Sequence, residues 1–249
     1  MPETEPQGML QSAYDKEDAD DIVERGKPSA KPKDAATLLL VRRDQAVPRV
    51  LMGKRAGGHA FMPNKYVFPG GRVDPFDGRA KSISELKSDV ARQLAVKARR
   101  SPRSLALTAI RETFEETGLI VGKPADVGGV PPAGWSPFYA LGVAPCLKDF
   151  TFIGRAVTPP YRPKRFDARF FMAEAEDALI DERPPVDGAE LSDLQWVSLD
   201  DALALDIPSV TQFMLGELKE RLERPNRWQG PAYLRWTRSG HAMDRIKRD

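Results

Sequence analysis

Three glutamates, Glu112, Glu115 and Glu116, stand within five positions of the stretch RETFEETG (111–118). The glycine that follows, Gly118, is a typical helix stop signal, so the carboxylates would crowd the last turns of a helix. This placement is unfavourable, because a helix C-terminus carries partial negative charge and glutamates four positions apart repel each other. Mg²⁺ or Mn²⁺ prefers oxygen ligands and would offset both costs.

Helical geometry places these three carboxylates on one side of the expected helix. The apolar residues Leu107, Ile110 and Phe114 form a stripe that predicts contact with a core. At about 100° per residue, the glutamates share an arc of roughly 100° turned away from that stripe. Arg111 falls on the seam between the two groups. Two interpretations remain open at this point: a solvated acidic face, which is the commoner one, and a divalent-metal site.

The elements around this helix follow from apolar patterns and turn residues. The stretches ATLLLVRR and RVLMGKR, separated by a break, predict a β-hairpin. A short strand then leads into the loop FPGG (68–71), and residues 83–98 are expected to be helical. Ser101 and Pro102 are typical of an N-cap and first helical position, so a second helix should run from there to Gly118. Strands and helices are mixed along the chain without a βαβ rhythm, which predicts an α+β fold or an α–β sandwich.

Composition sets the outer bounds on function. The chain has 249 residues with a net charge of +2, so no strong field favours nucleic acid or a membrane as partner. No apolar run approaches the ~20 residues that a membrane span needs. The one cysteine, Cys146, excludes an internal disulfide framework and a Cys-rich zinc site. The N-terminus lacks the pattern of a secretory signal, and we expect a cytoplasmic protein.

The sequence divides unevenly into three expected parts. Residues 1–33 are polar and read as a mobile tail, 34–225 as the main domain, and 226–249 as a basic extension with Trp and Tyr. A basic aromatic tail can indicate nucleic-acid binding, but this one has no periodicity and no RNA-binding motif. We therefore expect either a packed C-terminal extension or an oligomer contact, for instance in a homodimer.

Residues upstream of the glutamates carry a family resemblance. Gly71, Asp77 and the stretch RETFEETGL (111–119) resemble the Nudix box, G-x5-E-x7-R-E-U-x-E-E-x-G-U, where U is apolar. Asp77 stands where the family has glutamate, and Thr113 stands where an apolar residue is usual. A larger departure is the segment 78–104, which reads as a helical insertion within the box. A loop can accommodate such an insertion at modest entropic cost.

The split box narrows the resemblance further. Together with the later segment RAVTPPYRPKRFDARFF, it is similar to the Nudix branch of animal peroxisomal coenzyme A diphosphatases and their bacterial relatives. The resemblance covers 34–225 and implies the Nudix fold, an α–β–α sandwich with a mixed β-sheet. It also implies divalent-metal-dependent hydrolysis of the diphosphate in a nucleoside diphosphate linked to a moiety X, of coenzyme A type or nucleotide-sugar type. The alternative function is a catalytically inactive Nudix-fold module that binds a ligand or regulates.

The resemblance also implies roles for the box residues. Glu112, Glu115 and Glu116 would hold Mg²⁺ or Mn²⁺, the Gly71 carbonyl would be another ligand, and Arg111 would fix the carboxylates. The general base would be a box glutamate or an acid from a distant loop. Glu190, just before the expected strand LQWVSL, is the outside candidate, although an exposed loop acid is the commoner interpretation.

Candidate phosphate-binding residues lie in the alternating stretch RFDARFF (165–171). Arg165 and Arg169 fall on one face of the expected strand, where they would form an ion-pair ladder or contact a substrate phosphate. Arg55, at the end of RVLMGKR, is a further candidate. The insertion 78–104 is rich in Lys and Arg and joins the box at both ends. It is therefore predicted to lie at the substrate mouth and to recognise the anionic substrate or cover the site.

Two residue types are left with minor expectations. His59 and His241 are the only histidines, so a histidine-based metal cage is excluded, and any histidine-dependent chemistry would rest on one of them. Cys146 is expected to be a structural thiol.

Overall fold

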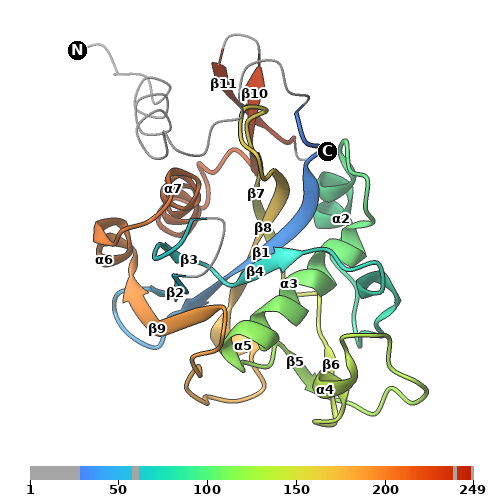
Figure 1. Ribbon diagram of the computed structural model, residues 1–249. Coiled ribbons are helices and arrows are strands. Elements are labelled where there is room, and N and C mark those ends of the chain that lie inside the picture. Colours follow the sequence, from blue (N-terminus) through green and yellow to red (C-terminus); the bar gives the residue numbers. More distant parts are fainter. Residues whose placement is uncertain (1–28, 58–61, 238–239, 248–249) are drawn as a thin grey trace.

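One mixed β-sheet forms the centre of the protein in the computed structural model, which describes residues 29–57, 62–237 and 240–247 (Figure 1). It has nine strands in the order β11-β10-β7-β8-β1-β2-β3, while β4 pairs with β1 and β9 with β2. The β1–β8 and β7–β10 pairs are parallel and the other pairs antiparallel. The strands are β1 (Lys33–Arg42), β2 (Arg49–Arg55), β3 (Tyr66–Val67), β4 (Gly70–Arg72), β7 (Thr151–Val157), β8 (Phe166–Glu174), β9 (Leu191–Ser198), β10 (Ala232–Thr237) and β11 (Gly240–Arg245).

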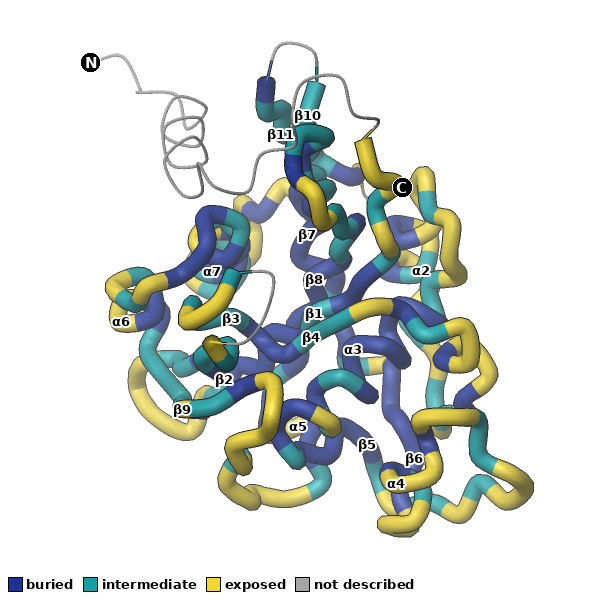
Figure 2. The backbone as a smooth tube through the Cα atoms, viewed as in Figure 1, coloured by how far each residue is buried: buried dark blue, intermediate teal, exposed yellow. Residues whose placement is uncertain are grey.

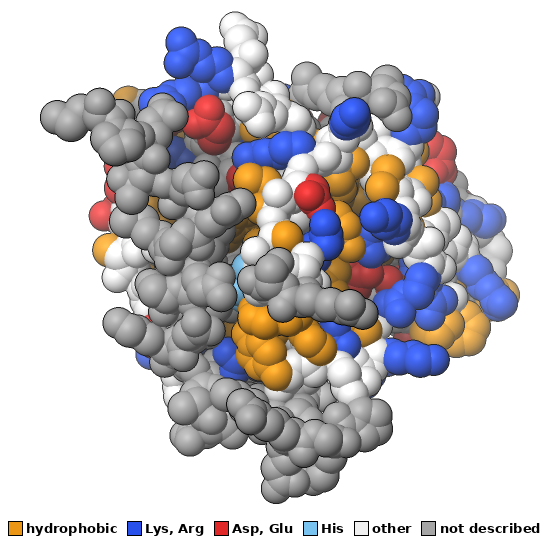
Figure 3. All heavy atoms as spheres, turned by 90° about the horizontal axis from the view of Figure 1, so that it is seen from above, with side chains coloured by type: hydrophobic (Ala, Val, Ile, Leu, Met, Phe, Trp, Pro, Cys, Tyr) orange, Lys and Arg blue, Asp and Glu red, His pale blue; other side chains and the backbone are white. Residues whose placement is uncertain are grey.

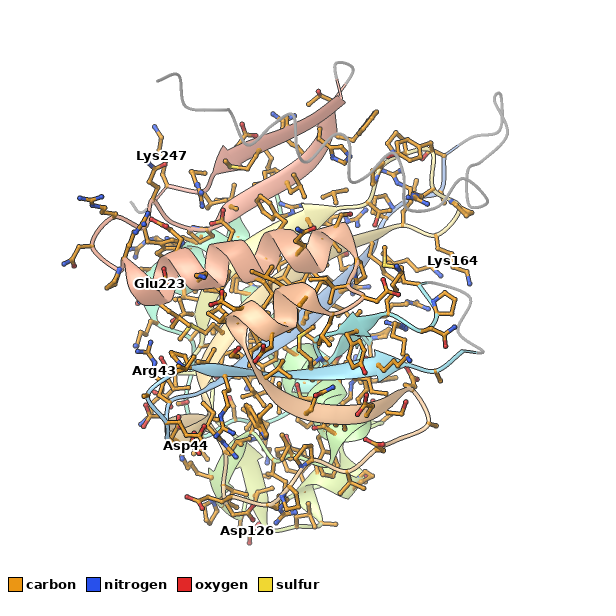
Figure 4. All side chains as sticks on the ribbon, turned by 90° about the vertical axis from the view of Figure 1, so that its left-hand side faces the viewer. Arg43, Asp44, Asp126, Lys164, Glu223 and Lys247 are labelled. Carbon is orange, nitrogen blue, oxygen red and sulfur yellow. The ribbon has the colours of Figure 1, made fainter. Side chains whose placement is uncertain are left out.

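Helices cover both faces of this sheet. They are α2 (Ser88–Ala95), α3 (Pro102–Thr117), α4 (Ser136–Tyr139), α5 (Ala175–Ala178), α6 (Leu199–Ala204) and α7 (Ser209–Glu223), with a 3₁₀ turn η2 (Asp77–Arg79). Helices α6 and α7 lie over one face, seen from their own side in Figure 4, and α3 lies on the other. A small two-stranded sheet, β5 (Gly122–Pro124) with β6 (Val143–Pro145), lies beyond α3.

Strand alternation divides the core between the two faces. Leu38 and Leu40 of β1 pack in one buried cluster with Ile110 of α3, whereas Leu39 packs in a second cluster with Met214 of α7. The central strands are accordingly the most deeply buried part of the chain (Figure 2). The predicted α–β–α sandwich with a mixed sheet is confirmed.

The signals that predicted the first hairpin and the main helix correspond to observed contacts. Strands β1 and β2 pair antiparallel, with Val41 opposite Val50. The Ser101 side chain accepts a hydrogen bond from the Ser104 backbone N–H at the start of α3. Gly118 ends the helix with φ of 70°, a left-handed conformation that glycine adopts without steric cost. These features place the three glutamates in the last two turns of α3, as expected.

The expected C-terminal extension belongs to the central sheet, whereas most of the expected N-terminal tail is not described. Residues 1–28 of the expected tail lie outside the described part of the chain, and β1 begins at Lys33. At the other end, β10 and β11 form a hairpin that pairs with β7, so residues 232–245 extend the central sheet. Within the described residues, no helix has the length and apolar character needed to cross a membrane.

Candidate active site

Arg111 contacts three carboxylates near the end of α3. Its Nε donates to Asp77 Oδ1 at 2.7 Å, its Nη1 to Glu115 Oε2 at 2.7 Å, and its Nη2 lies 2.8 Å from Glu112 Oε1. Burial alone would lower the pKa of Arg111, but its hydrogen bond with Asp77 and the neighbouring negative charges raise it. Arg111 therefore stays charged and contacts Glu112 and Glu115, and the orienting role expected of it stays a prediction.

Asp77 is the buried anchor of this arginine. It is 0% exposed and accepts hydrogen bonds from Arg111, from Thr108 Oγ1 at 2.7 Å and from Trp135 Nε1 at 3.1 Å. The Asp74 backbone N–H also donates to it at 2.8 Å. Asp77, which stands where the Nudix box has glutamate, thus holds the Arg111 side chain in place through buried hydrogen bonds. The role of Thr108 could have been inferred from its position three residues before Arg111 on the same helix. Trp135 comes from a distant part of the chain, and no local pattern in the sequence indicates its contact with Asp77.

The Trp135 contact leads to a stability prediction. Trp135→Phe keeps an aromatic ring against Phe138, which lies 5.5 Å away between ring centroids, but removes the N–H that Asp77 accepts. Leaving part of a buried acceptor without its donor should lower the free energy of unfolding by about 1–3 kcal/mol in a urea titration. Tyr139→Phe is the control, because it removes an exposed hydrogen bond to the Lys81 carbonyl. Equal losses in the two variants would contradict the anchoring role of Trp135.

Glu116 is buried and Glu112 is half-buried against the backbone of β4. Glu116 is 5% exposed, and its Oε2 accepts a hydrogen bond from the Gly70 N–H at 2.8 Å. Burial is the main cause that raises the pKa of Glu112 to about 7 and that of Glu116 to about 8, and the neighbouring carboxylates contribute to both shifts. Arg111 opposes the shift at Glu112, as the Gly70 hydrogen bond and Arg55 do at Glu116. The charged forms of both carboxyl groups are therefore disfavoured in the folded protein.

Glu115 is placed differently from its two neighbours. Its side chain is 43% exposed and forms the ion pair with Arg111. The three predicted metal ligands therefore comprise the buried Glu116, the half-buried Glu112 and the exposed Glu115, and Arg111 contacts the last two.

Glu190 joins this cluster from another part of the chain. Strand β9 pairs with β2, with Leu191 opposite Arg55, and the Ala56 N–H donates to the Glu190 carbonyl at 3.1 Å. This pairing brings Glu190 to the same cavity as Glu112, and its negative charge raises the pKa of Glu112 and Glu116. The distant-loop acid proposed from sequence thus lies beside the carboxylates of α3.

Gly71 leaves room for the cluster at its closest point. A Cβ atom at this position would lie 2.4 Å from a Glu112 carboxylate oxygen, so no other residue fits without displacing that side chain. In the described part of the chain, no three acidic, histidine or cysteine side chains are yet arranged around one point as metal ligands. The donor set nevertheless fits Mg²⁺ or Mn²⁺, since it offers hard carboxylate oxygens beside a glycine backbone.

A cavity of about 430 Å³ extends from this cluster along the α7 face of the sheet. Its near end is lined by Glu112, Glu190, Arg55 and the two glycines of β4. The predicted substrate residue Arg55 therefore lies at the cavity. The volume is in the range of small-molecule sites. The remaining wall is mostly apolar and includes Phe68, Val157, Phe166, Ala168, Phe170 and Leu234.

Arg169, a second predicted phosphate contact, is buried elsewhere. It is 0% exposed, and its Nη1 donates to Asp34 Oδ1 at 3.1 Å and to the Asp167 carbonyl at 2.7 Å. Asp167 also pairs with Arg155, so these side chains form the ion-pair ladder that was the alternative interpretation. The placement of Arg169 does not support a contact with substrate.

Arg165 is also directed away from the cavity. Its Nε donates to the Thr158 carbonyl at 3.0 Å and its Nη1 to the Ala30 carbonyl at 2.7 Å. Alternation along β8 instead turns Phe166, Ala168 and Phe170 toward the cavity. The two faces of this strand were predicted correctly, but its apolar face is the one that lines the cavity.

The insertion does not lie at the cavity, contrary to expectation. No described residue of 78–104 lines it, because Ala80, Val90 and Leu94 pack into the core on the α3 face. Its helix α2 is shorter than the expected 83–98, and Lys and Arg side chains lie on the outer surface on that side of the molecule (Figure 3). Arg103 is occupied by the Gly78 and Ala80 carbonyls and by Glu85. The two ends of the insertion lie next to the box because they are joined to it in sequence. Burial of its apolar side chains, however, holds the insertion on the α3 face of the sheet, away from the cavity.

The two histidines and the cysteine are the remaining candidate residues. His241 lines the cavity, and His59 lies outside the described residues. Cys146 is buried, with its Sγ 3.3 Å from Ser84 Oγ, as expected of a structural thiol.

Comparison with known proteins gives a consistent family. The family model of the NUDIX domain matches residues 31–214. A curated relative, "Putative nudix hydrolase 7" of Caenorhabditis elegans, is 28% identical over 189 residues, which are 69% of this chain and 53% of the relative. The chain thus spans about half the length of that relative. A solved NUDIX hydrolase from Alicyclobacillus acidocaldarius is 29% identical with a TM-score of 0.56, covering 75% of this chain and 90% of that one. This chain belongs to the NUDIX domain family.

Proposed function

We propose that this protein hydrolyses the diphosphate linkage of a nucleoside diphosphate joined to a moiety X, with Mg²⁺ or Mn²⁺ as cofactor. The observation that carries the proposal is that Glu112 and Glu190 line a small-molecule cavity beside Gly71, with Glu116 next to them on the Gly70 N–H. A merely solvated acidic face is not expected to bury Glu116 and half-bury Glu112.

The box residues would have distinct tasks in this reaction. Glu112 and Glu116 would hold the cation, with the Gly71 carbonyl beside them and Glu115 at the rim. The bound ion would supply charge neutralisation on the phosphates and a lowered pKa for the attacking water. Arg111, held by Asp77, keeps the carboxylates of Glu112 and Glu115 in place.

Two further residues would act from the opposite side of the cavity. Glu190 enters it from the β9 side, so we assign its carboxylate oxygen the proton released by the attacking water. Arg55 lines the same end and would contact a substrate phosphate through its guanidinium.

The moiety X remains of coenzyme A type or nucleotide-sugar type in this proposal. The test is a panel of coenzyme A, nucleotide sugars, ADP-ribose and dinucleoside polyphosphates, assayed with Mg²⁺, with Mn²⁺ and with a chelator. We expect metal-dependent release of a nucleoside monophosphate or phosphoadenylate from at least one compound. Tight binding of a panel member without turnover under any metal condition would instead favour the inactive ligand-binding module.

Gly71→Ala should separate positioning from folding. The added methyl group would displace the Glu112 carboxylate, a side-chain end that can rotate away, so we expect a folded protein. Hydrolysis of the best panel substrate should fall at least about 10-fold, as for other losses of ligand positioning. Gly78→Ala is the matched control, because its methyl group would meet the Ser104 Cβ at an ordinary 3.4 Å. Equal activity in both variants would contradict the role given to Gly71.

A further inference from the structure

The cavity wall has a component that lies outside the matched NUDIX domain. The family match ends at residue 214, whereas Leu234 of β10 and His241 of β11 line the cavity. Strand β10 pairs parallel with β7, which places Leu234 opposite Ala156, another lining residue. The C-terminal hairpin therefore closes the end of the cavity that is built from apolar side chains.

An aromatic stack fixes this hairpin against the loop after β7. The rings of His241 and Trp236 are opposite each other across the hairpin, 4.8 Å apart at 88°. Trp236 also contacts Tyr161 edge-on, with ring centroids 5.1 Å apart. Arg162, which is 9% exposed, lies with its guanidinium 5.7 Å from the Tyr161 ring centroid and lines the cavity. Contacts between aromatic rings therefore hold this part of the cavity wall in place.

The two ends of the cavity differ in chemistry. The carboxylates, with Arg55, mark the end where a diphosphate and its cations would lie. At the other end lie Phe166, Phe170, Leu234 and the His241 ring, with Thr158 and Arg162 beside them. A mostly aromatic and apolar wall with a few polar groups suits the flat ring of a base, because the aromatic side chains offer ring contacts and the polar groups can fix its orientation.

We infer that the C-terminal hairpin forms the specificity wall of a base-binding subsite, in which the aromatic base of the nucleoside diphosphate lies against His241 and the Phe side chains of β8. This inference rests on the proposed function for the position of the diphosphate. It assigns substrate choice to a segment beyond the NUDIX domain, and Leu234 and His241 become specificity-determining residues.

The test compares AMP with ribose 5-phosphate, which share a phosphate and a sugar and differ only by the base. Calorimetric titration should show AMP binding at least about 10-fold more tightly to the wild-type protein. His241→Ala should weaken AMP about 5-fold or more, in line with the loss of one ring contact, and leave ribose 5-phosphate unchanged. Arg235→Ala is the control, since Arg235 belongs to the same hairpin, pairs with Asp244 and does not line the cavity.

A second variant keeps the inference testable if His241→Ala fails to fold. Ala168→Leu adds volume from the sheet side of the same subsite and should also weaken AMP selectively. Equal affinity of the wild-type protein for AMP and ribose 5-phosphate, or equal weakening of both ligands in the two variants, would overturn the inference. Binding is measured without turnover, so a failure of the proposed hydrolysis would appear separately, as an inactive protein that still selects AMP.

Discussion

Replacing Glu116 by glutamine is expected to lower metal-dependent diphosphate hydrolysis at least about 100-fold while the protein stays folded. The amide keeps an oxygen that can accept the Gly70 N–H but loses the charge that a cation requires. The same variant should melt at a higher temperature in metal-free buffer. Burial raises the pKa of Glu116 to about 8, which means that the charged form is disfavoured in the folded state.

The two readouts of Glu116→Gln separate function from stability. A gain of about 1 kcal/mol would raise the melting temperature by roughly 2–4 °C for a domain of this size. Glu220→Gln is the matched control: Glu220 is a glutamate of α7 with a surface ion pair to Arg224, worth little in either assay. Wild-type turnover by Glu116→Gln at saturating Mg²⁺ would restore the solvated acidic face as the explanation of the cluster.

Replacing Arg111 by leucine should have the largest effect on stability. Asp77 is fully buried, and its charged partner would be lost while the carboxylate remains. Breaking a buried pair from one side costs about 3–5 kcal/mol, which a urea titration would show as a lower midpoint. Activity should fall as well, because Glu112 and Glu115 lose the guanidinium that positions them.

A double variant distinguishes the buried charge from a simple packing loss. Asp77→Asn combined with Arg111→Leu removes the uncompensated charge, so it should recover part of the lost stability without recovering activity. If the double variant is as unstable as Arg111→Leu alone, the loss comes from packing around position 111 and not from Asp77.

Local signals were enough to predict the elements that carry the box. Helix α3 begins and ends where Ser101, Pro102 and Gly118 predicted, because helix capping depends only on neighbours within one helical turn. The angular positions of Glu112, Glu115 and Glu116 also followed from helical geometry. Their different burial did not, because it depends on β4 and on Glu190, which arrive from elsewhere in the chain.

Charge was a weaker guide to the cavity than strand alternation. Arg165 and Arg169 were candidate phosphate contacts because phosphates are anionic. Each instead donates a hydrogen bond to a nearby backbone carbonyl and does not line the cavity. A basic composition likewise suggested that the insertion meets the substrate, whereas Val90 and Leu94 direct it to the α3 face. The pairing of β10 with β7, which closes the cavity, has no local signal in the sequence because it joins segments far apart in the chain.

Binding of Mn²⁺ to the free protein tests the central claim most directly, because it does not require X to be known. Titration followed by electron paramagnetic resonance would compare the wild-type protein with Glu112→Gln, Glu116→Gln and the control Glu220→Gln. We predict that the wild-type protein and Glu220→Gln bind Mn²⁺ alike. The dissociation constant should rise at least about 10-fold in each of the other two variants. Equal Mn²⁺ affinity in all four proteins would contradict a metal site built from Glu112 and Glu116.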